Sequence, residues 1–433
     1  MNIRVFQAGK GDCLLLTATD GTRVLVDGGM REDYRLHVAP ALAKIRKQDL
    51  DLDLVYVSHI DRDHISGVLQ LMDDLVAWRV FDYQRGAGNL EYPEPPTPRP
   101  PEIKNLWHNA FHELVSANKA DIERTLAARA NLLATADDRE LRLVGVEQRD
   151  LATSIAEGIE LSRRASPEQL GIPVNRQFDG KLALVRAGAK PVQLGVLKIT
   201  LIGPFPRDLR QLRKEWNVWL REAKKQHELL RERMQRDAGR LATDDLDRLR
   251  RVLNLASGEL GDRTKVTTPN LASLMLLVEE GARTVLLTGD GHWEDILKGL
   301  ESAGRLEADG GLHVDVLKVQ HHGSENNLTP EFAKRITADR YLFCANGEHA
   351  NPDPRIVQAI IESRLGSNAL RSTNPGATGK FKFQFNSSQE VTGVNEREHM
   401  KEIEKLVAKA AAVSSKRMTF TFLKHSSYAI NLT

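Results

Sequence analysis

The sequence predicts an α/β protein in which sheets and helices form layers. Short runs of β-branched and aliphatic residues alternate with helical patterns near the amino end, and the alternation returns after residue 270. Gly and Asp-Gly turns separate the runs. Several of the runs are followed at once by His or Asp residues, whose side chains can bind metals. In layered α/β folds the strand ends are where sites assemble, so we expect the functional residues there.

The composition is that of an ordinary globular chain. Of its 433 residues, 41% are hydrophobic and 28% are charged, so it can bury a core without disulfides or structural metals. The 61 Lys and Arg against 59 Asp and Glu leave a formal charge of +2, so any attraction to nucleic acid has to be local. Cys13 and Cys344 cannot form a disulfide framework, which favours a reducing, cytoplasmic setting.

No segment matches a targeting or membrane sequence. The first ten residues contain charged side chains and no apolar run followed by a small-residue cleavage site. The longest apolar runs have about eight residues, whereas a membrane-spanning helix needs about 20. We therefore expect a soluble protein without a membrane partner.

The first half of the core is predicted to span residues 1–83. Its expected elements are, in order, strands at 3–9, 13–19 and 23–29, a helix at 37–47, a strand at 52–59 and a helix at 66–75.

Residues 84–190 are predicted to be a connector followed by a helical insertion. Six of the 17 prolines lie between residues 92 and 101, which predicts a stiff, solvated connector. Residues 105–166 are charged, rich in Ala and Leu, and mostly helical in pattern. A strand that returns to the core is expected within residues 191–206.

A helical hairpin is predicted for residues 207–262. Apolar residues recur at three- and four-residue steps from Leu209 to Met234, as on one face of a helix. Gly239 and then Thr243 supply a helix stop and a new N-cap, so a second helix is expected to fold back.

This hairpin allows two interpretations. Residues 207–251 contain 14 Lys and Arg against 9 Asp and Glu, which is either a solvated helix face or a contact for a phosphate backbone. Trp216 and Trp219 either pack against the core or anchor a partner protein.

The second half of the core is predicted to span residues 263–390. Its strands are expected at 270–281, 283–290, 314–324 and 340–347, with a helix at 293–300. Residues 391–433 are set apart as a C-terminal extension with a helical run and a strand-like segment.

The motif Ser-His-Ile-Asp-Arg-Asp-His follows one predicted strand and precedes a predicted helix. It brings four polar residues together: His59, Asp61, Asp63 and His64. On a strand-to-helix turn these side chains can point to one side and divide between two neighbouring cations, because imidazole and carboxylate are usual ligands of first-row metals. The alternative is a charged helix start that an aspartate caps.

Two later strands end in the same kinds of residue. Asp290 ends one of them, and His321 and His322 end the next. The alternatives are a turn aspartate before Gly291 and two surface imidazoles. If these strand ends share one edge of a sheet, they join the earlier motif in one site.

In their order along the chain, these runs resemble the metallo-β-lactamase superfamily. Within it they are similar to the soluble hydrolase domain of ComEC-type competence proteins. The runs that carry the resemblance are residues 7–16, 24–29, 58–67, 270–290, 317–324, 345–360 and 373–383. The resemblance implies an αββα sandwich, here with long helical insertions.

The resemblance also implies a ligand set for two divalent metal ions, Zn²⁺ or Mn²⁺. His59 and Asp61 are implied for the first ion, and Asp63 and His64 for the second. Asp290 is implied as the bridging ligand between them.

His322 is implied as the last ligand because a Gly-Ser step follows it, with His321 as the alternative. The remaining histidines of the middle region, His108, His112 and His227, lie in predicted helical insertions and are expected to be surface or packing residues. A carboxylate-rich set shifts the expected ion toward Mn²⁺ or Mg²⁺ relative to Zn²⁺.

The function implied is that of a metal-dependent hydrolase, and a phosphodiesterase or nuclease is favoured because two cations that activate a hydroxide suit in-line displacement. Asp63 and Asp290 are the expected catalytic residues. Lys318, His321 and His349 are candidates for neutralising substrate phosphate.

Two alternatives remain. The first is hydrolysis of a small-molecule ester or amide, with the insertion at 105–166 as a lid over the substrate. The second is a partner-activated effector or sensor subunit of a bacterial defence system, whose helical insertions bind a protein partner.

Overall fold

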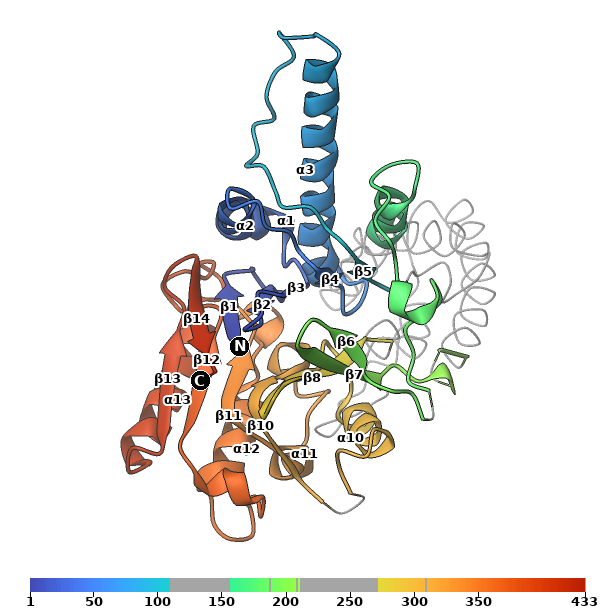
Figure 1. The fold of residues 1–433 in the computed structure, drawn as a ribbon. Helices are drawn as coiled ribbons and strands as arrows, with labels where there is room; N and C mark the ends of the chain where they lie inside the picture. The colour runs from blue at the N-terminus through green and yellow to red at the C-terminus, as the bar shows by residue number, and fades with distance from the viewer. Residues whose placement is uncertain (110–155, 187, 208, 211–271, 308–309, 433) are drawn as a thin grey trace, which may run out of the picture.

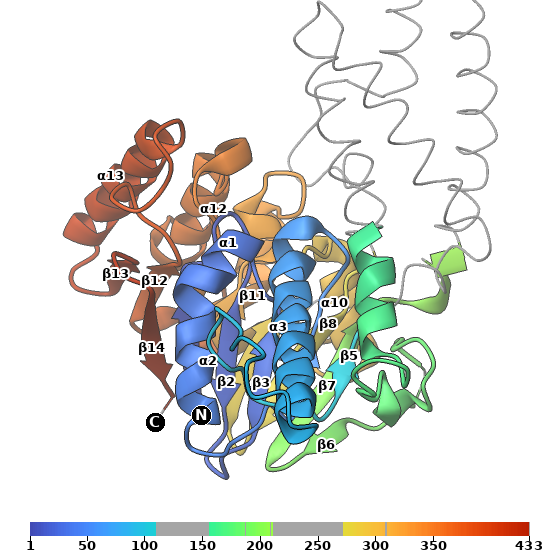
Figure 2. The same ribbon diagram turned by 90° about the horizontal axis from the view of Figure 1, so that it is seen from above.

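The computed structural model describes residues 1–109, 156–186, 188–207, 209–210, 272–307 and 310–432. Two sheets pack face to face, and helices cover the outer face of each (Figures 1 and 2). Three clusters of buried apolar side chains fill the spaces between these four layers. The predicted helix–sheet–sheet–helix sandwich is therefore confirmed for the described residues.

The first sheet has the strand order β14-β1-β2-β3-β4-β5. Its strands are β1 Asn2–Phe6, β2 Leu14–Thr17, β3 Arg23–Val26, β4 Leu54–Tyr56, β5 Leu106–Trp107 and β14 Ser427–Asn431. The pairs from β14 to β3 are antiparallel, whereas β3, β4 and β5 run parallel. Parallel strands end at the same edge, so the loop after β4 and the loop after β5 leave the sheet together.

The second sheet has the order β13-β12-β11-β10-β9-β8-β7-β6. Its strands are β6 Val192–Leu194, β7 Leu197–Gly203, β8 Met275–Glu280, β9 Arg283–Leu287, β10 Leu312–Lys318, β11 Ile336–Phe343, β12 Phe381–Phe385 and β13 Met418–Phe422. Strands β9 to β13 are parallel neighbours, so their carboxyl ends share one edge.

Helices α2 Ala39–Arg46 and α3 Arg62–Gly86 cover the first sheet (Figure 2). The buried side of α3, with Ile65, Val68 and Met72, packs in the same cluster as the strand residue Val55. The spacing of these helix residues at three and four positions places them on one face. The carboxyl half of α3 projects away from the body of the molecule (Figure 1).

The second sheet is covered by α10 Trp293–Ser302, α11 Pro330–Arg335, α12 Pro354–Leu365 and α13 Arg397–Val413. Helix α12 begins where local chemistry favours it, because Pro354 occupies its first turn and the Asp353 side chain accepts a hydrogen bond from the backbone N–H of Arg355. In the part of the chain that the structure describes, no helix is both long and apolar enough to cross a bilayer.

The strands and helices predicted for the two halves of the core are confirmed, with one correction in the region between them. Leu106–Trp107 form β5, which pairs with β4, although the sequence predicted a helical segment there. A two-residue strand is too short to show a periodic pattern. Residues 156–165 are helical as predicted.

Much of the predicted insertions, with His112, Trp216, Trp219 and His227, lies outside the described residues. The division into domains stays a prediction. The predicted C-terminal extension contributes a strand to each sheet, since β13 pairs with β12 and β14 pairs with β1.

Candidate metal centre

The predicted metal loop connects β4 of the first sheet to α3 and meets the carboxyl ends of second-sheet strands. Asp290 follows β9, and His322 lies in the short 3-10 turn Gln320–Gly323 after β10. The backbone N–H of Leu274 donates to the Ser58 carbonyl at 2.7 Å, which ties the loop to the second sheet. The site therefore lies where the ends of both sheets meet.

Two glycines allow the metal loop and the start of α3 to pack closely against neighbouring backbone. A Cβ on Gly67 would lie 2.0 Å from the Gly28 carbonyl oxygen, and a Cβ on Gly11 would lie 1.7 Å from the Asp63 carbonyl oxygen. Any side chain at these positions would push the backbones apart. The start of α3 is thus held between the loops that follow β1 and β3.

Asp290 lies among three imidazoles. Its Oδ2 atom is 3.6 Å from His59 Nε2 and 3.4 Å from His322 Nε2, and its Oδ1 atom is 3.5 Å from His64 Nε2. This central position is the one that the predicted bridging ligand requires.

The other two carboxylates of the loop flank this group. Asp61 Oδ2 lies 3.5 Å from His59 Nε2, and Asp63 Oδ2 lies 3.1 Å from His322 Nε2. The structure therefore brings together all six residues predicted as metal ligands. Their donor atoms form two overlapping groups that share His64: those of His59, His64 and Asp290 lie within 4.8 Å of one another, and so do those of Asp12, His64 and His322.

The unsatisfied atoms of this cluster test whether it fits a metal. Within the described residues, the Nε2 atoms of His59, His64 and His322 and the Oδ1 atom of Asp290 are buried and have no hydrogen-bond partner. Buried polar atoms without partners are rare because each one loses its hydration without compensation. Four of them that converge on one space are accounted for by cations that accept their lone pairs.

The opposite ring nitrogens are all engaged. His59 Nδ1 lies 3.1 Å from Ser58 Oγ, and His64 Nδ1 lies 3.0 Å from Asp27 Oδ2. His322 Nδ1 lies 2.7 Å from the Cys344 carbonyl oxygen. Such a contact fixes the ring and leaves the Nε2 lone pair for a metal. The residues present therefore fit divalent cations.

Asp12 and Asp27 are functional residues that the sequence reasoning missed. Asp27 accepts from the backbone N–H of Ser58 at 2.7 Å and from its hydroxyl at 2.8 Å. Asp12 Oδ1 lies 3.5 Å from His322 Nδ1. Both aspartates stand beside a glycine in runs that carried the family resemblance, and that was the available signal.

Lys318 corrects one prediction. It is 2% exposed, its ammonium lies 2.5 Å from Asp12 Oδ2, and it donates to the Gly289 carbonyl at 2.9 Å. Its charge is thus used inside the protein, where it offsets the aspartates, and it does not reach a substrate phosphate.

Nearby carboxylates shift the pKa values of His64 and His322. Burial lowers the pKa of His64, but the Asp290, Asp12 and Asp27 carboxylates outweigh it, so the pKa lies well above its ordinary value. The pKa of His322 is raised well above its ordinary value in the same way, mainly by Asp290 against burial. Without cations the cluster holds protons, and a divalent cation would replace them.

His321 and His322 differ in their surroundings. Both have left-handed backbones, with φ of 46° and 57°, a strained arrangement that occurs at functional sites. His321 Nε2 lies 3.7 Å from Asp290 Oδ2, and its Nδ1 lies 2.5 Å from Asn327 Oδ1. Because the Asn327 amide donates to the Asp290 carbonyl, its Oδ1 is the acceptor, so His321 carries its proton on Nδ1.

His321 therefore turns an Nε2 lone pair toward Asp290. The Nε2 atoms of His59 and His322 face the same Asp290 oxygen, at 3.6 and 3.4 Å, and His322 also faces Asp63 at 3.1 Å. His322 thus contacts two of the clustered carboxylates, whereas His321 contacts Asp290 and Asn327.

His349 lies outside the cluster, in the 3-10 turn Glu348–Ala350. Its side chain is 59% exposed, and its Nε2 is 3.5 Å from the ammonium of Lys10. Lys10 precedes Gly11, which packs against Asp63. His349 and Lys10 thus form a hydrogen-bonded pair beside Gly11, at the border of the metal loop.

His108 corrects a second prediction. It directly follows β5, is 1% exposed and exchanges backbone hydrogen bonds with the Asn175 side chain at 3.1 and 2.8 Å. It was expected on a helical insertion. The structure places it instead one strand away from the metal loop.

Comparison with known proteins agrees with this fold. The family model of the metallo-beta-lactamase superfamily matches residues 7–77, which carry β2 to β4, the metal loop and the buried part of α3. Together with the four layers, this match confirms the predicted metallo-β-lactamase-like fold, a fold of metal-dependent hydrolases. The narrower resemblance to ComEC-type proteins stays a prediction.

Other comparisons add little. No curated protein is significantly similar to the chain. Among solved structures, the crystal structure of Zn²⁺-bound PqqB from Methylobacterium extorquens is similar over 100% of each chain, at 9% identity and a TM-score of 0.31, which is too low to bear on function.

Proposed function

We propose that this protein is a metal-dependent hydrolase of phosphodiester bonds. One observation carries the proposal: the Asp290 carboxylate lies within 3.6 Å of the buried Nε2 atoms of His59, His64 and His322, and none of these atoms has a hydrogen-bond partner among the described residues. His59, Asp61 and His321 would hold one divalent cation, and Asp63, His64 and His322 a second. Bound cations would lower the pKa of a water molecule and neutralise negative charge on substrate oxygens.

The chain's own residues supply position and access. Asp63 and Asp61 side chains are 14% and 27% exposed, whereas Asp290 is 3% exposed, so solvent and substrate reach the cluster from the side of the two loop aspartates. A carboxylate there can accept a hydrogen bond from the attacking water and orient it. Asp290 and His64 stay out of water and keep the donors fixed.

A phosphodiester is favoured over an uncharged ester for two reasons. The set contains three carboxylates, and such oxygen-rich sets suit the hard cations that accompany phosphate chemistry. The half-buried Lys10 and the exposed His349 provide donors beside the metal loop, where they can bind phosphate oxygens. The charge of Lys10 is partly offset by Glu348, whose carboxylate lies 2.9 Å from it.

The test is a substrate panel with metal as the variable. Purified protein, loaded with Mn²⁺ or Zn²⁺ or stripped with a chelator, is assayed on bis(p-nitrophenyl) phosphate, on single- and double-stranded DNA and on p-nitrophenyl acetate. Asp63→Asn and Asp290→Asn are compared with Asp82→Asn, which removes a surface carboxylate paired with Arg99. We expect metal-dependent phosphodiester cleavage that Asp82→Asn keeps and the other two lose.

Two results would reject the proposal. Cleavage of the acetate alone would indicate a small-molecule esterase. Metal-loaded protein that cleaves none of these substrates would indicate an effector that needs a partner.

A further inference from the structure

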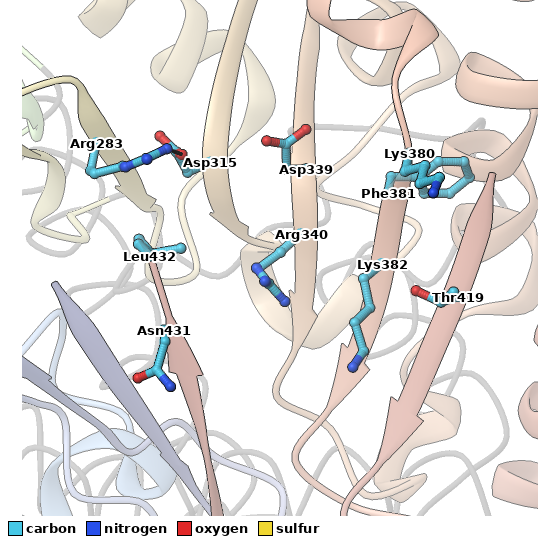
Figure 3. A pocket seen from close by; sticks show the side chains of 10 residues that line it. All are labelled: Arg283, Asp315, Asp339, Arg340, Lys380, Phe381, Lys382, Thr419, Asn431 and Leu432. Atoms are coloured by element: carbon cyan, nitrogen blue, oxygen red, sulfur yellow. Dashed lines mark hydrogen bonds and ion pairs between the residues drawn. The ribbon is translucent and has the colours of Figure 1, made fainter. Parts of the chain in front are cut away.

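A second polar hollow lies at the opposite end of the sandwich from the metal centre. It has a volume of about 420 Å³ and is lined by strands β9 to β13 on one side and by the last residues of β14 on the other (Figure 3). Its lining includes the amino ends of β12 and β13, whereas the metal ligands follow the carboxyl ends of β9 and β10. The hollow is therefore separate from the metal centre.

Its floor carries two cations side by side. Arg340 on β11 and Lys382 on β12 are register partners, and their side chains extend in the same direction (Figure 3). Adjacent strands are about 4.8 Å apart, so the two charged side chains leave the sheet as close neighbours. Like charges in this arrangement repel and destabilise the sheet.

The other charges of the hollow do not offset this pair. Asp315 pairs with Arg283 at 3.2 Å, and Asp339 lies 3.1 Å from His313. Among the described residues, no carboxylate lies within ion-pair distance of Arg340 or Lys382. Partial burial, followed by the Arg340 charge, lowers the pKa of Lys382, which is the expected effect of an uncompensated neighbour.

The remaining lining suits an anion with an organic part. Thr419 offers a hydroxyl, and Asn431, whose Oδ1 accepts from Asn2, keeps its NH₂ group as a donor. Leu432 is a buried apolar residue of the same hollow, whereas the Phe381 ring points to the opposite face of β12, where it packs with Tyr341 and Arg364. A guanidinium fork beside an ammonium is a common pair for phosphate, because the fork bonds two oxygens and the ammonium adds a point charge.

We propose that this hollow binds a small phosphate-bearing molecule, with the phosphate between Arg340 and Lys382 and the organic part against Leu432. The site is distinct from the metal centre and does not depend on the function proposed for it. Since Asn431 ends β14 and Leu432 follows it, an occupied hollow joins the last strand of the first sheet to the second sheet.

Binding of inorganic phosphate and of phenylphosphonate, which has no ester bond to hydrolyse, tests the proposal. Calorimetric titrations are made on the full chain, both metal-loaded and metal-free. The double variant Arg340→Gln/Lys382→Gln is compared with Arg4→Gln/Lys44→Gln, which removes the same charge from another hollow, on the outer face of the first sheet.

We expect the first variant to lose affinity for both probes by about tenfold or more, and the second to stay within about twofold of the unmodified chain. Phenylphosphonate should bind more tightly than inorganic phosphate. Unchanged binding in the first variant, or an equal loss in both variants, would overturn the proposal.

A second measurement does not rely on variants. Hydrogen exchange of the unmodified chain with and without phenylphosphonate should show protection in β12, β13 and β14. Protection confined to residues 320–323 and 58–64 would place the probe at the metal centre and would also overturn the proposal.

Discussion

Asp27 Oδ2 lies 3.0 Å from His64 Nδ1, on the side of the ring that faces away from Asp290. The carboxylate holds the ring and keeps the proton on Nδ1, which leaves Nε2 for a cation. Asp27 is itself fixed by two hydrogen bonds from Ser58. The orientation of a proposed metal ligand is thus set by Asp27, which follows the neighbouring strand β3.

Replacing Asp27 by Ala should weaken metal binding without removing a ligand. We expect an affinity loss of about 10- to 100-fold, the usual effect of losing such a partner. Competition with a chromogenic chelator measures it. Asp53→Ala is the control, because Asp53 accepts from the backbone of Arg23 in the same sheet. Equal affinity in Asp27→Ala and the unmodified chain would contradict this positioning role.

Metal binding should release protons. In the metal-free chain the pKa values of His64 and His322 are raised well above the ordinary value of 6.5, so both rings are protonated at neutral pH. A cation must displace these protons, and its apparent affinity should rise between about pH 6 and about pH 8. Calorimetry in buffers of different ionisation enthalpy counts the protons, and a binding enthalpy that is independent of buffer would refute the prediction.

The same shifts set the pH dependence of the metal-free protein. Because the folded pKa values lie above the unfolded value, the protonated rings contribute stability that is fully present below about pH 6.5 and is lost as the pH rises through the folded values. Unfolding of the chelator-treated chain at a series of pH values should follow this trend. The metal-loaded chain should lack this contribution.

Lys318→Met should destabilise the protein by about 3 to 5 kcal/mol, because it removes the buried ammonium that pairs with Asp12 and faces Asp290. The double variant Asp12→Asn/Lys318→Met should recover part of this loss. Lys104→Met removes an exposed pair with Asp53 and should cost less than about 1 kcal/mol. Denaturant unfolding measures all three, and similar costs for Lys318→Met and Lys104→Met would contradict the account.

Two glycines of α3 should respond in opposite directions to Ala. Gly67→Ala places a Cβ 2.0 Å from the Gly28 carbonyl and should cost about 1 to 3 kcal/mol and reduce metal affinity. Gly86→Ala, with nothing within 4 Å, should be neutral or stabilising by up to about 1 kcal/mol. Thermal unfolding separates the two, and stabilisation by both substitutions would show that the close approach at Gly28 is not essential.

The sequence could predict the strand ends and the ligand types because both are local. A run such as residues 52–64 contains the strand, the turn and the ligands in one stretch. The role of Lys318 could not be predicted, since it depends on Asp12, a residue of the loop between β1 and β2 that only the packing of the two sheets brings to it. The pairing of β14 with β1, between residues 431 and 2, is equally remote in sequence.

His108 shows why the position of a residue in the fold could not always be predicted from the sequence around it. The two strand residues that precede His108 are too few to show a periodic pattern. Its position beside the metal loop therefore follows only from the pairing of β5 with β4. The charged hollow around Arg340 and Lys382 has the same origin, because its residues come from separate strands of both sheets.

The most direct test of the central claim is the position of bound metal. Crystals grown with Mn²⁺ or Zn²⁺ and measured at the absorption edge of the metal should give two anomalous peaks on either side of Asp290, one near His59 and one near His64 and His322. Asp290→Asn should lose at least one of the peaks. No peak beside Asp290 in the unmodified chain, with the metal present in excess, would contradict the account.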